Sequence, residues 1–188
     1  VPKDALYALS DTLKADTEAL SVLSTYAINY IYLVDEILYP RSDRSLRTFL
    51  DQTIRLASNY SDSAEDSLLL IYLFTHCIIG ASNFYQSAVT DEAYRDMLSL
   101  LETRIEANFD NINLDNKFEF LVCCSIAGYS AKIANRINGE ALQSLSPDGT
   151  FLVDTLNTAG QQNKISFSDS EHRNVLYLMS QTPFQRAL

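Results

Sequence analysis

Apolar side chains recur along this chain at intervals of three and four residues, the spacing that places them on one face of an α-helix. No stretch alternates apolar and polar residues over the length that a half-buried β-strand needs. The pattern predicts an all-α fold in which residues 1–188 form a single domain. About seven or eight helices in antiparallel hairpins would account for it, as a helical bundle or in a toroid-like or solenoid-like layout.

The first apolar stripe extends over residues 3–39 and ends before Pro40, a residue type that terminates helices. The stripe keeps its phase through Asp16 and Thr17, either of which is a suitable N-cap for a new helix. Residues 3–39 therefore form one long helix or two, and the cap favours two. The residues expected on this apolar face are Leu6, Leu9, Leu13, Leu20, Leu23, Ala27, Tyr30, Val34 and Ile37.

Two later segments are amphipathic, and we expect each to bury one face. In residues 44–58 the apolar stripe consists of Leu46, Phe49, Leu50, Ile54 and Ala57. Thr90 is a suitable cap for a second amphipathic helix that reaches residue 108, with negative charge in its first turn. The apolar stripe of this second helix consists of Tyr94, Met97, Leu98, Leu101 and Ile105.

Two other segments are apolar on nearly every side, which predicts that they lie at the centre of the fold. Asp62 and Glu65 stand three residues apart ahead of the apolar run 67–84, like an N-cap and the third residue of its helix. Asp115 or Asn116 opens the second such helix, which we expect to continue to residue 138 and to end at Gly139.

The C-terminal part contains shorter elements. Residues 146–149 have the sequence Ser-Pro-Asp-Gly, which fits a type I turn, and Thr150 is a suitable cap for a short helix to about residue 158. A loop over residues 161–167 precedes the last helix, residues 169–180, for which Ser168 and Glu171 form a capping box. Its inward-facing residues are expected to be Val175, Leu176 and Met179.

An apolar helix is followed by an amphipathic one three times along the chain. The pairs are residues 17–39 with 44–58, 64–85 with 91–108, and 115–138 with 150–159. This order predicts helical hairpins whose apolar helices pack together inside and whose amphipathic helices cover them. No repeated side-chain signature accompanies the alternation, so the repeat is one of architecture.

Composition supports a globular domain with a core of its own. Hydrophobic residues make up 47% of the 188 residues and charged residues 20%, which excludes intrinsic disorder. The uncharged stretches 19–34 and 67–90 fall short of the about 20 predominantly apolar residues that cross a bilayer. We therefore expect no transmembrane segment and interpret both stretches as buried helices.

Charge suggests where a partner could bind. The net charge is −10, which makes nucleic acid an improbable ligand, and residues 61–120 hold 11 acidic but only three basic side chains. Our leading hypothesis is a non-enzymatic protein-interaction module whose acidic central surface binds a protein or peptide with a basic surface. The partner-binding residues would be Asp91, Glu92, Asp96, Glu102 and Glu106, which lie off the apolar stripe of their helix and should be exposed.

Two other hypotheses stay open. The first is a binder of a small or lipid-like molecule, or an enzyme, with a tyrosine-lined helical cavity, because tyrosine offers both an apolar ring and a hydroxyl. Residues near the mouth of that cavity would be Tyr26, Asn29, Tyr30, Asp35 and His76. The second is an acidic decoy that imitates nucleic acid, which would need rows of carboxylates on one exposed face.

Metal and cofactor signatures are missing from the sequence. Cys77 and the pair Cys123–Cys124 lie in apolar runs, and no C-x-x-C or H-x-x-x-H spacing accompanies them. We expect buried, metal-free thiols beside His76, no cofactor, and no nucleotide-binding or nucleophile-elbow motif. Free thiols favour a reducing, cytoplasmic location, although the chain begins with Val1, so a removed segment could hide a signal peptide.

Overall fold

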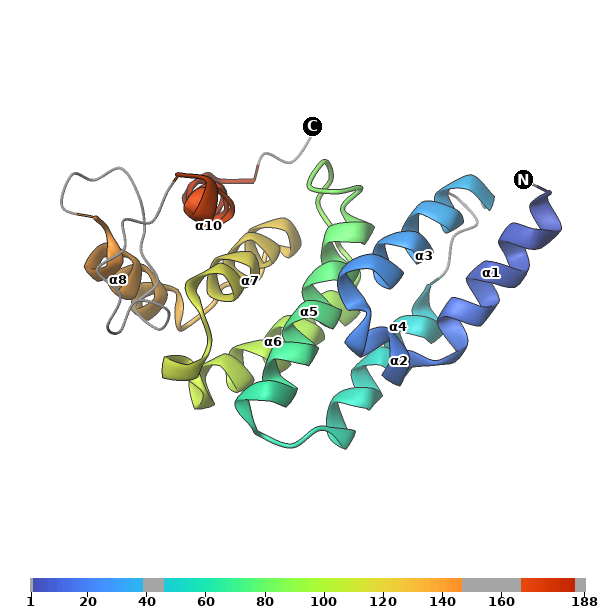
Figure 1. Cartoon of the computed structure of the whole chain (residues 1–188), viewed down its shortest axis with the longest axis horizontal. Helices are drawn as coiled ribbons and strands as arrows, with labels where there is room; N and C mark the ends of the chain where they lie inside the picture. The colour runs from blue at the N-terminus through green and yellow to red at the C-terminus, as the bar shows by residue number, and fades with distance from the viewer. Residues whose placement is uncertain (1, 39–45, 147–166, 185–188) are drawn as a thin grey trace.

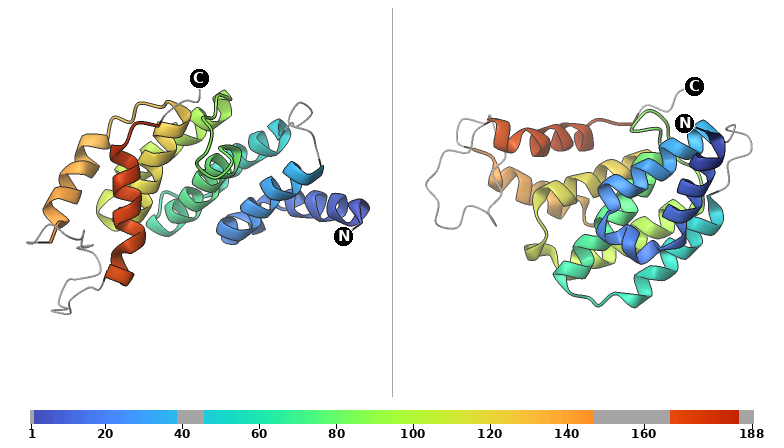
Figure 2. Two further views of the ribbon diagram at one scale, coloured as in Figure 1. Left: turned by 90° about the horizontal axis from the view of Figure 1, so that it is seen from above. Right: turned by 45° about the vertical axis from the view of Figure 1, so that its right-hand side comes forward.

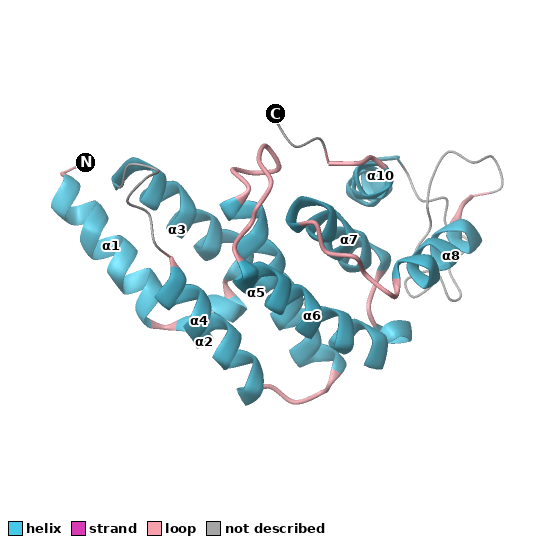
Figure 3. Ribbon diagram, turned by 180° about the vertical axis from the view of Figure 1, so that it is seen from behind, coloured by secondary structure: helices cyan, strands magenta, loops and turns pink. Residues whose placement is uncertain are grey.

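The computed structural model describes residues 2–38, 46–146 and 167–184. Within these ranges the chain forms nine α-helices and two short 3₁₀ turns, and the ribbon shows helices and loops alone (Figure 3). The all-α prediction is confirmed. The turn expected at 146–149 and the short helix at 150–158 lie almost wholly outside the described residues.

The N-terminal segment is divided twice rather than once. It forms α1 (Lys3–Ala15), α2 (Thr17–Val22) and α3 (Ser24–Leu38). The first break is the expected one, because the Asp16 side chain accepts a hydrogen bond from the Ala19 N–H at 2.9 Å and so caps α2. The second break, at Leu23, was not expected, because the apolar stripe continues through it in phase.

The first amphipathic segment forms α4 (Arg47–Leu56), followed by a 3₁₀ turn (Ala57–Asn59). The central apolar helix is α5 (Ala64–Ala81). The expected cap at Asp62 is wrong by one residue, because the Ser63 side chain accepts from the Asp66 N–H. The Asp66 carboxylate in turn accepts from the backbone N–H and hydroxyl of Ser61, so these two residues close the turn that precedes α5.

The second amphipathic segment forms α6 (Glu92–Ala107), and a 3₁₀ turn (Phe109–Asn111) follows it. Asp91, rather than Thr90, is its N-cap and accepts from the Ala93 N–H. The expected stripe is confirmed in full: Tyr94, Met97, Leu98, Leu101 and Ile105 are all buried.

The long helix expected over residues 115–138 is instead two helices, α7 (Leu114–Ala127) and α8 (Ala134–Ser144). Asn113 caps α7, and Gly128 ends it with a φ of 62°, the left-handed conformation that suits glycine at a helix C-terminus. Gly139, the expected stop, lies inside α8. The wrong glycine was chosen because either one can follow a helical stripe.

The last helix, α10 (Phe167–Gln181), begins two residues before its expected start. Of its three expected inward residues, Leu176 is buried and Met179 is half-buried, but Val175 is exposed. Arg173 takes a buried position and pairs with Asp115 of α7 at 3.1 Å. The contact between α7 and α10 therefore includes the charged Arg173 and leaves the aliphatic Val175 exposed.

The helices form a row, with α1, α3, α5, α7 and α10 following one another across the molecule (Figures 1 and 2). Each of these helices packs against the next, and α4 and α6 pack against each other, with α6 also contacting α5 and α7. The apolar helices are therefore central and the amphipathic ones cover them, as the hairpin prediction requires for its first two pairs. In the third pair α8, not the segment 150–159, is the helix that follows α7.

Gly80 allows a close approach between α3 and α5. A Cβ atom at Gly80 would stand 2.4 Å from Cδ2 of Tyr32, so the tyrosine ring of α3 rests directly on the backbone of α5. Tyr32 is itself buried. The central pair of helices therefore packs through a glycine and an aromatic ring.

Candidate functional site

The five residues expected around a tyrosine-lined cavity do not meet at one place. Asn29 and His76 are neighbours, with Oδ1 of Asn29 3.3 Å from Nδ1 of His76. Tyr26 and Tyr30 are exposed on α3, whereas Asp35 is buried on the side of α3 that faces α1. The structure thus divides the expected cavity between a polar cluster, an exposed face and a buried ion pair.

Asp35 serves to join two helices. Its carboxylate accepts from Nζ of Lys14 at 2.7 and 3.0 Å and from the hydroxyl of Ser10 at 3.1 Å, both residues of α1. A carboxylate buried to this extent needs such partners, because desolvating it without them would cost several kcal/mol, roughly. Asp35 is therefore a structural residue of the α1–α3 contact.

His76 belongs to a polar cluster between α3, α5 and α7. Its Nε2 lies 3.7 Å from Oε1 of Glu119, a buried oxygen that accepts no hydrogen bond from the described residues. Burial raises the pKa of Glu119 above its ordinary value. Burial also lowers the pKa of His76. Sequence inspection missed Glu119, because a single Glu in an apolar helix has no motif around it.

A strained turn lies next to this cluster. Asn83, Phe84 and Tyr85 have φ values of 54°, 54° and 68°, three successive residues in the left-handed region that residues other than glycine rarely adopt. The turn brings Tyr85 close to Glu119 and Cys123, and burial is the main cause that raises the pKa of Tyr85. The pockets found among the described residues are lined by other side chains than His76.

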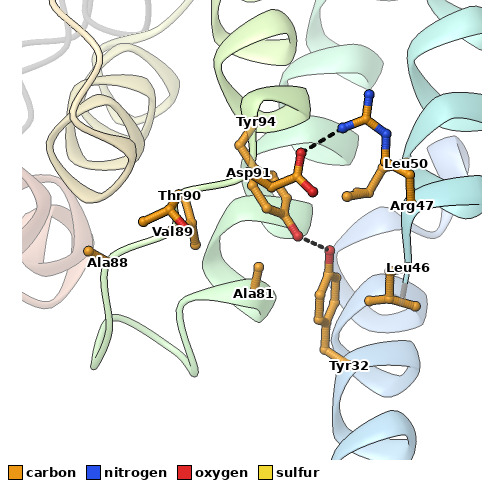
Figure 4. A pocket seen from close by; sticks show the side chains of 10 residues that line it. All are labelled: Tyr32, Leu46, Arg47, Leu50, Ala81, Ala88, Val89, Thr90, Asp91 and Tyr94. Carbon is orange, nitrogen blue, oxygen red and sulfur yellow. Dashed lines mark hydrogen bonds and ion pairs between the residues drawn. The ribbon is translucent and has the colours of Figure 1, made fainter. Parts of the chain in front are cut away.

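A pocket of about 430 Å³ does exist between α3, α4 and the start of α6, and two tyrosines form part of its wall (Figure 4). The hydroxyls of Tyr32 and Tyr94 face each other at 3.3 Å, and at the edge Arg47 pairs with Asp91 at 2.8 Å. None of these residues is among the five expected to line a cavity, and Asp91 had been expected on the acidic docking surface instead. Helical periodicity could not show that Tyr32 meets Tyr94, because the two residues come from different helices.

The expected acidic docking surface is only partly present. Glu92, Asp96 and Glu106 are exposed along α6, and Asp91 is exposed but already paired with Arg47. The prediction that Glu102 is exposed is wrong, since only 6% of it is accessible. Helical spacing placed Glu102 off the main stripe, but it could not show that the segment after α7 packs over that side of α6.

Glu102 binds the segment that leads into α8. Its carboxylate accepts from the hydroxyl of Tyr129 at 2.7 Å, from the backbone N–H of Ile133 at 3.0 Å and from the N–H of Lys132. These backbone donors lie at the N-terminus of α8, where a helix has unpaired N–H groups and favours negative charge. Glu102 of α6 therefore caps α8 from outside that helix.

One apolar surface that the sequence predicted to be buried is exposed. Five large apolar residues of Leu23 and α3 are between 46% and 77% exposed, and Val22 beside them is 67% exposed. We name this surface the α3 apolar face; its stripe consists of Leu23, Tyr26, Tyr30, Leu33 and Ile37. We expected three of these residues, Leu23, Tyr30 and Ile37, on the buried face. The other residues expected on that face in this segment, Leu20, Ala27 and Val34, are indeed buried.

The sequence contained a signal for this misassignment. Apolar residues occupy more of α3 than one face, so a second stripe, offset from the buried one, is present in the same segment. Periodicity detects both stripes but does not say which one a neighbouring helix covers. Here α1 and α5 flank α3 in the row and cover the other stripe (Figure 1).

The thiols are buried. Cys77, Cys123 and Cys124 are unbridged, and burial raises the pKa of each, which leaves them unreactive. Among the described residues no group of three or more His, Cys, Asp and Glu side chains is placed to hold a metal ion. His76 is mostly buried as well, with 13% of its side chain exposed.

Among the described helices α5 alone is long and apolar enough to cross a membrane by length and composition. More than half of it is buried inside the fold, against α3, α6 and α7. The core helix of a globular domain passes the same test, so this property by itself assigns no segment to a membrane.

Comparisons with known proteins give no match: no protein-family model, no curated protein and no solved structure is similar to this chain at the thresholds applied.

Proposed function

We propose that this chain is a protein-interaction module that binds an amphipathic helix of its partner on the α3 apolar face. The observation that carries the proposal is the exposure of Leu23, Tyr26, Tyr30, Leu33 and Ile37, between 46% and 77%. Their alternating spacing of three and four residues is the spacing of a seam at which two helices pack.

The energetics favour a partner on this face. Burying one large apolar side chain contributes about 1.5–3 kcal/mol relative to leaving it in water. Tyrosine is enriched at the centre of protein interfaces, because it gives large contact area while its hydroxyl stays hydrogen-bonded. Tyr26 and Tyr30 are both on the face, and Tyr26 is the more exposed of the two.

The acidic surface of α6 carries less weight as a docking site. Glu102 is engaged with the start of α8 and Asp91 with Arg47, which leaves Glu92, Asp96 and Glu106 on a helix that also exposes Arg95. Scattered exposed charges are the ordinary solvated surface of a globular domain. A strongly basic partner is therefore not part of the proposal.

The pocket between α3, α4 and α6 also carries less weight as a ligand site. Its two charged side chains, Arg47 and Asp91, already bind each other, and its two tyrosine hydroxyls face each other. A ligand would have to compete with both interactions. The α3 apolar face has no such competing contact within the described residues.

Selection of helical peptides on the whole chain tests this function. A displayed library of amphipathic helical peptides should yield binders to the wild-type chain whose affinity falls at least tenfold on Tyr30→Glu. Leu142→Glu is the matched control, since Leu142 is equally apolar and 66% exposed but lies on α8. The proposal fails if no peptide is selected, or if the selected peptides bind the Tyr30→Glu variant as tightly as the wild type.

A further inference from the structure

We infer that the occupant of the α3 apolar face is a second copy of this chain, with the two α3 helices antiparallel and Tyr30 on the twofold axis. The inference rests on the proposed function, because it names the partner of that same face. Such a dimer requires that the α3 apolar face be complementary to itself, that no like charges meet across it, and that the buried area reach that of a specific interface.

The stripe is nearly symmetric about Tyr30. Leu23 and Ile37 stand seven residues on either side of Tyr30, and Tyr26 and Leu33 stand four and three residues from it. When the helix direction is reversed, Leu23 falls opposite Ile37, and Tyr26 falls opposite Leu33 to within one residue. A twofold interface pairs one patch with itself, so it needs a pattern of this kind.

Charge permits two copies to approach although each carries −10 overall. The chain has no charged residue between positions 19 and 34, so no like charges meet at the centre of the interface. The same stretch offers nothing for a charged partner to recognise. A second copy, by contrast, supplies an uncharged apolar surface of the same length.

The antiparallel direction follows from Glu36, which is exposed near one end of the stripe. In a parallel pair the two Glu36 carboxylates would stand side by side and repel each other. In an antiparallel pair about Tyr30 they are twelve residues apart along the axis, or about 18 Å at the rise of an α-helix. That separation exceeds the screening length of about 8 Å at physiological salt, so the repulsion becomes small.

The area reaches the size of a specific interface. If a large side chain offers about 150–250 Å², the exposed fractions of the five stripe residues and Val22 amount to roughly 600 Å² per copy. Two copies would bury about 1,200 Å² through these side chains alone, which is where stable, specific interfaces begin. An uncovered apolar patch of this size is also at the upper end for a monomer.

Sedimentation of the whole chain tests the pairing. Between about 1 and 300 μM, concentrations spanning the range of moderate affinities, the mass should rise from that of one 21.1 kDa chain to that of two. Tyr30→Glu should keep the chain monomeric, whereas Leu142→Glu on α8 should not change the mass. Circular dichroism melts of both variants establish that each is folded.

Cross-linking tests the geometry. Under mild oxidation Tyr30→Cys should give a covalent dimer, because the two positions meet on the axis, while the native cysteines are buried and do not interfere. Glu36→Cys is the control and should cross-link at least tenfold more slowly. Equal cross-linking at both positions would indicate a parallel pair and overturn the antiparallel arrangement.

The possible failures can be told apart. A chain that stays monomeric at every concentration but binds selected helical peptides through Tyr30 overturns the second copy and leaves the proposed function standing. A monomer that binds no helical peptide overturns both. A chain that stays monomeric and co-sediments with phosphatidylcholine vesicles, but no longer co-sediments after Tyr30→Glu, would show that the face binds lipid and would overturn the dimer.

Discussion

Two glutamates show how the surroundings of a residue decide its role. Glu102 and Glu106 lie one turn apart on α6, and sequence pattern treats them alike. Glu106 is exposed, whereas Glu102 is buried and accepts hydrogen bonds from Tyr129, Lys132 and Ile133. The difference comes entirely from the segment that precedes α8.

Alanine at these two positions should therefore have unequal effects. Glu102→Ala leaves buried backbone donors unpaired, and we expect it to lower the free energy of unfolding by about 1–3 kcal/mol. Glu106→Ala, the control on the same helix, should change it by less than about 0.5 kcal/mol. Urea denaturation measures both. Equal small losses would mean that Glu102 does not hold the start of α8.

The buried carboxyl of Glu119 predicts a dependence of stability on pH. Its pKa in the folded chain is raised above the ordinary value of 4.5, chiefly by burial, so folding favours the protonated form. Stability is then greatest below pH 4.5 for this group and is lost as the pH rises through the raised pKa. Each pKa unit of the difference corresponds to about 1.4 kcal/mol.

Glu119→Gln removes this titration while keeping the size of the side chain. We expect the variant to gain stability relative to the wild type as the pH rises from 4 to 8, with His76 and His172 present in both proteins. Urea unfolding at a series of pH values measures the difference, and the exposed Glu92→Gln is the control. Parallel stability curves for wild type and Glu119→Gln would contradict the prediction.

At the scale of elements, ion pairs join several neighbouring helices. Lys14 and Asp35 join α1 to α3, Arg173 and Asp115 join α10 to α7, and Arg104 of α6 binds Asp62 and the carbonyls before α5. Lys117 of α7, fully buried, pairs with Glu140 of α8 and lies 3.9 Å from the ring centre of Phe109. Most of these partners are more than 20 residues apart, beyond the reach of local pattern.

The two glycines near the α7–α8 junction give an element-scale prediction. Gly128 ends α7 in the left-handed region, so Gly128→Ala should cost about 1–2 kcal/mol. Gly139 lies inside α8 with no atom within 4 Å of a Cβ there, so Gly139→Ala should add about 0.5–1 kcal/mol. Chemical denaturation of the two variants checks the opposite signs. A gain of stability for Gly128→Ala together with a loss for Gly139→Ala would contradict the break at Gly128 and favour one helix that continues to residue 138.

At the scale of the whole molecule, the row of helices explains why an apolar face stays open. The inner helices of the row, α3, α5 and α7, each have a row neighbour on two sides, and α5 and α7 also contact α6. α3 is flanked by α1 and α5 (Figures 1 and 2), and its outward stripe stays 46–77% exposed. Such a layout buries the contacts between neighbours and presents the remaining faces for binding.

A dimer formed through this face would also tie folding to concentration. A partner that binds only the folded chain stabilises it by mass action, so the apparent stability of the wild type would rise with protein concentration. The stripe that the dimer would bury consists of uncharged residues, so pairing would remove no charged side chain of this stripe from water.

The sequence by itself determined the helical class, the order of apolar and amphipathic helices, and the complete buried stripe of α6. These properties are local, because the 3.6-residue period and a capping residue such as Asp16 act within one helix. Caps were misplaced at α5, α6 and α7, where neighbouring polar residues can each serve. The competing choices differ by about 1 kcal/mol or less, so packing decides between them.

Only the tertiary structure decided which of two apolar stripes on α3 is buried, that Glu102 is a cap and not a docking residue, and that Tyr32 meets Tyr94. Each of these depends on a partner from another helix, at a sequence separation that periodicity does not record. Hydrophobic burial is non-directional, so an apolar stripe favours burial but does not determine which surface covers it. For α3 the outward stripe is exposed within the described residues, and we propose that a second copy of the chain covers it.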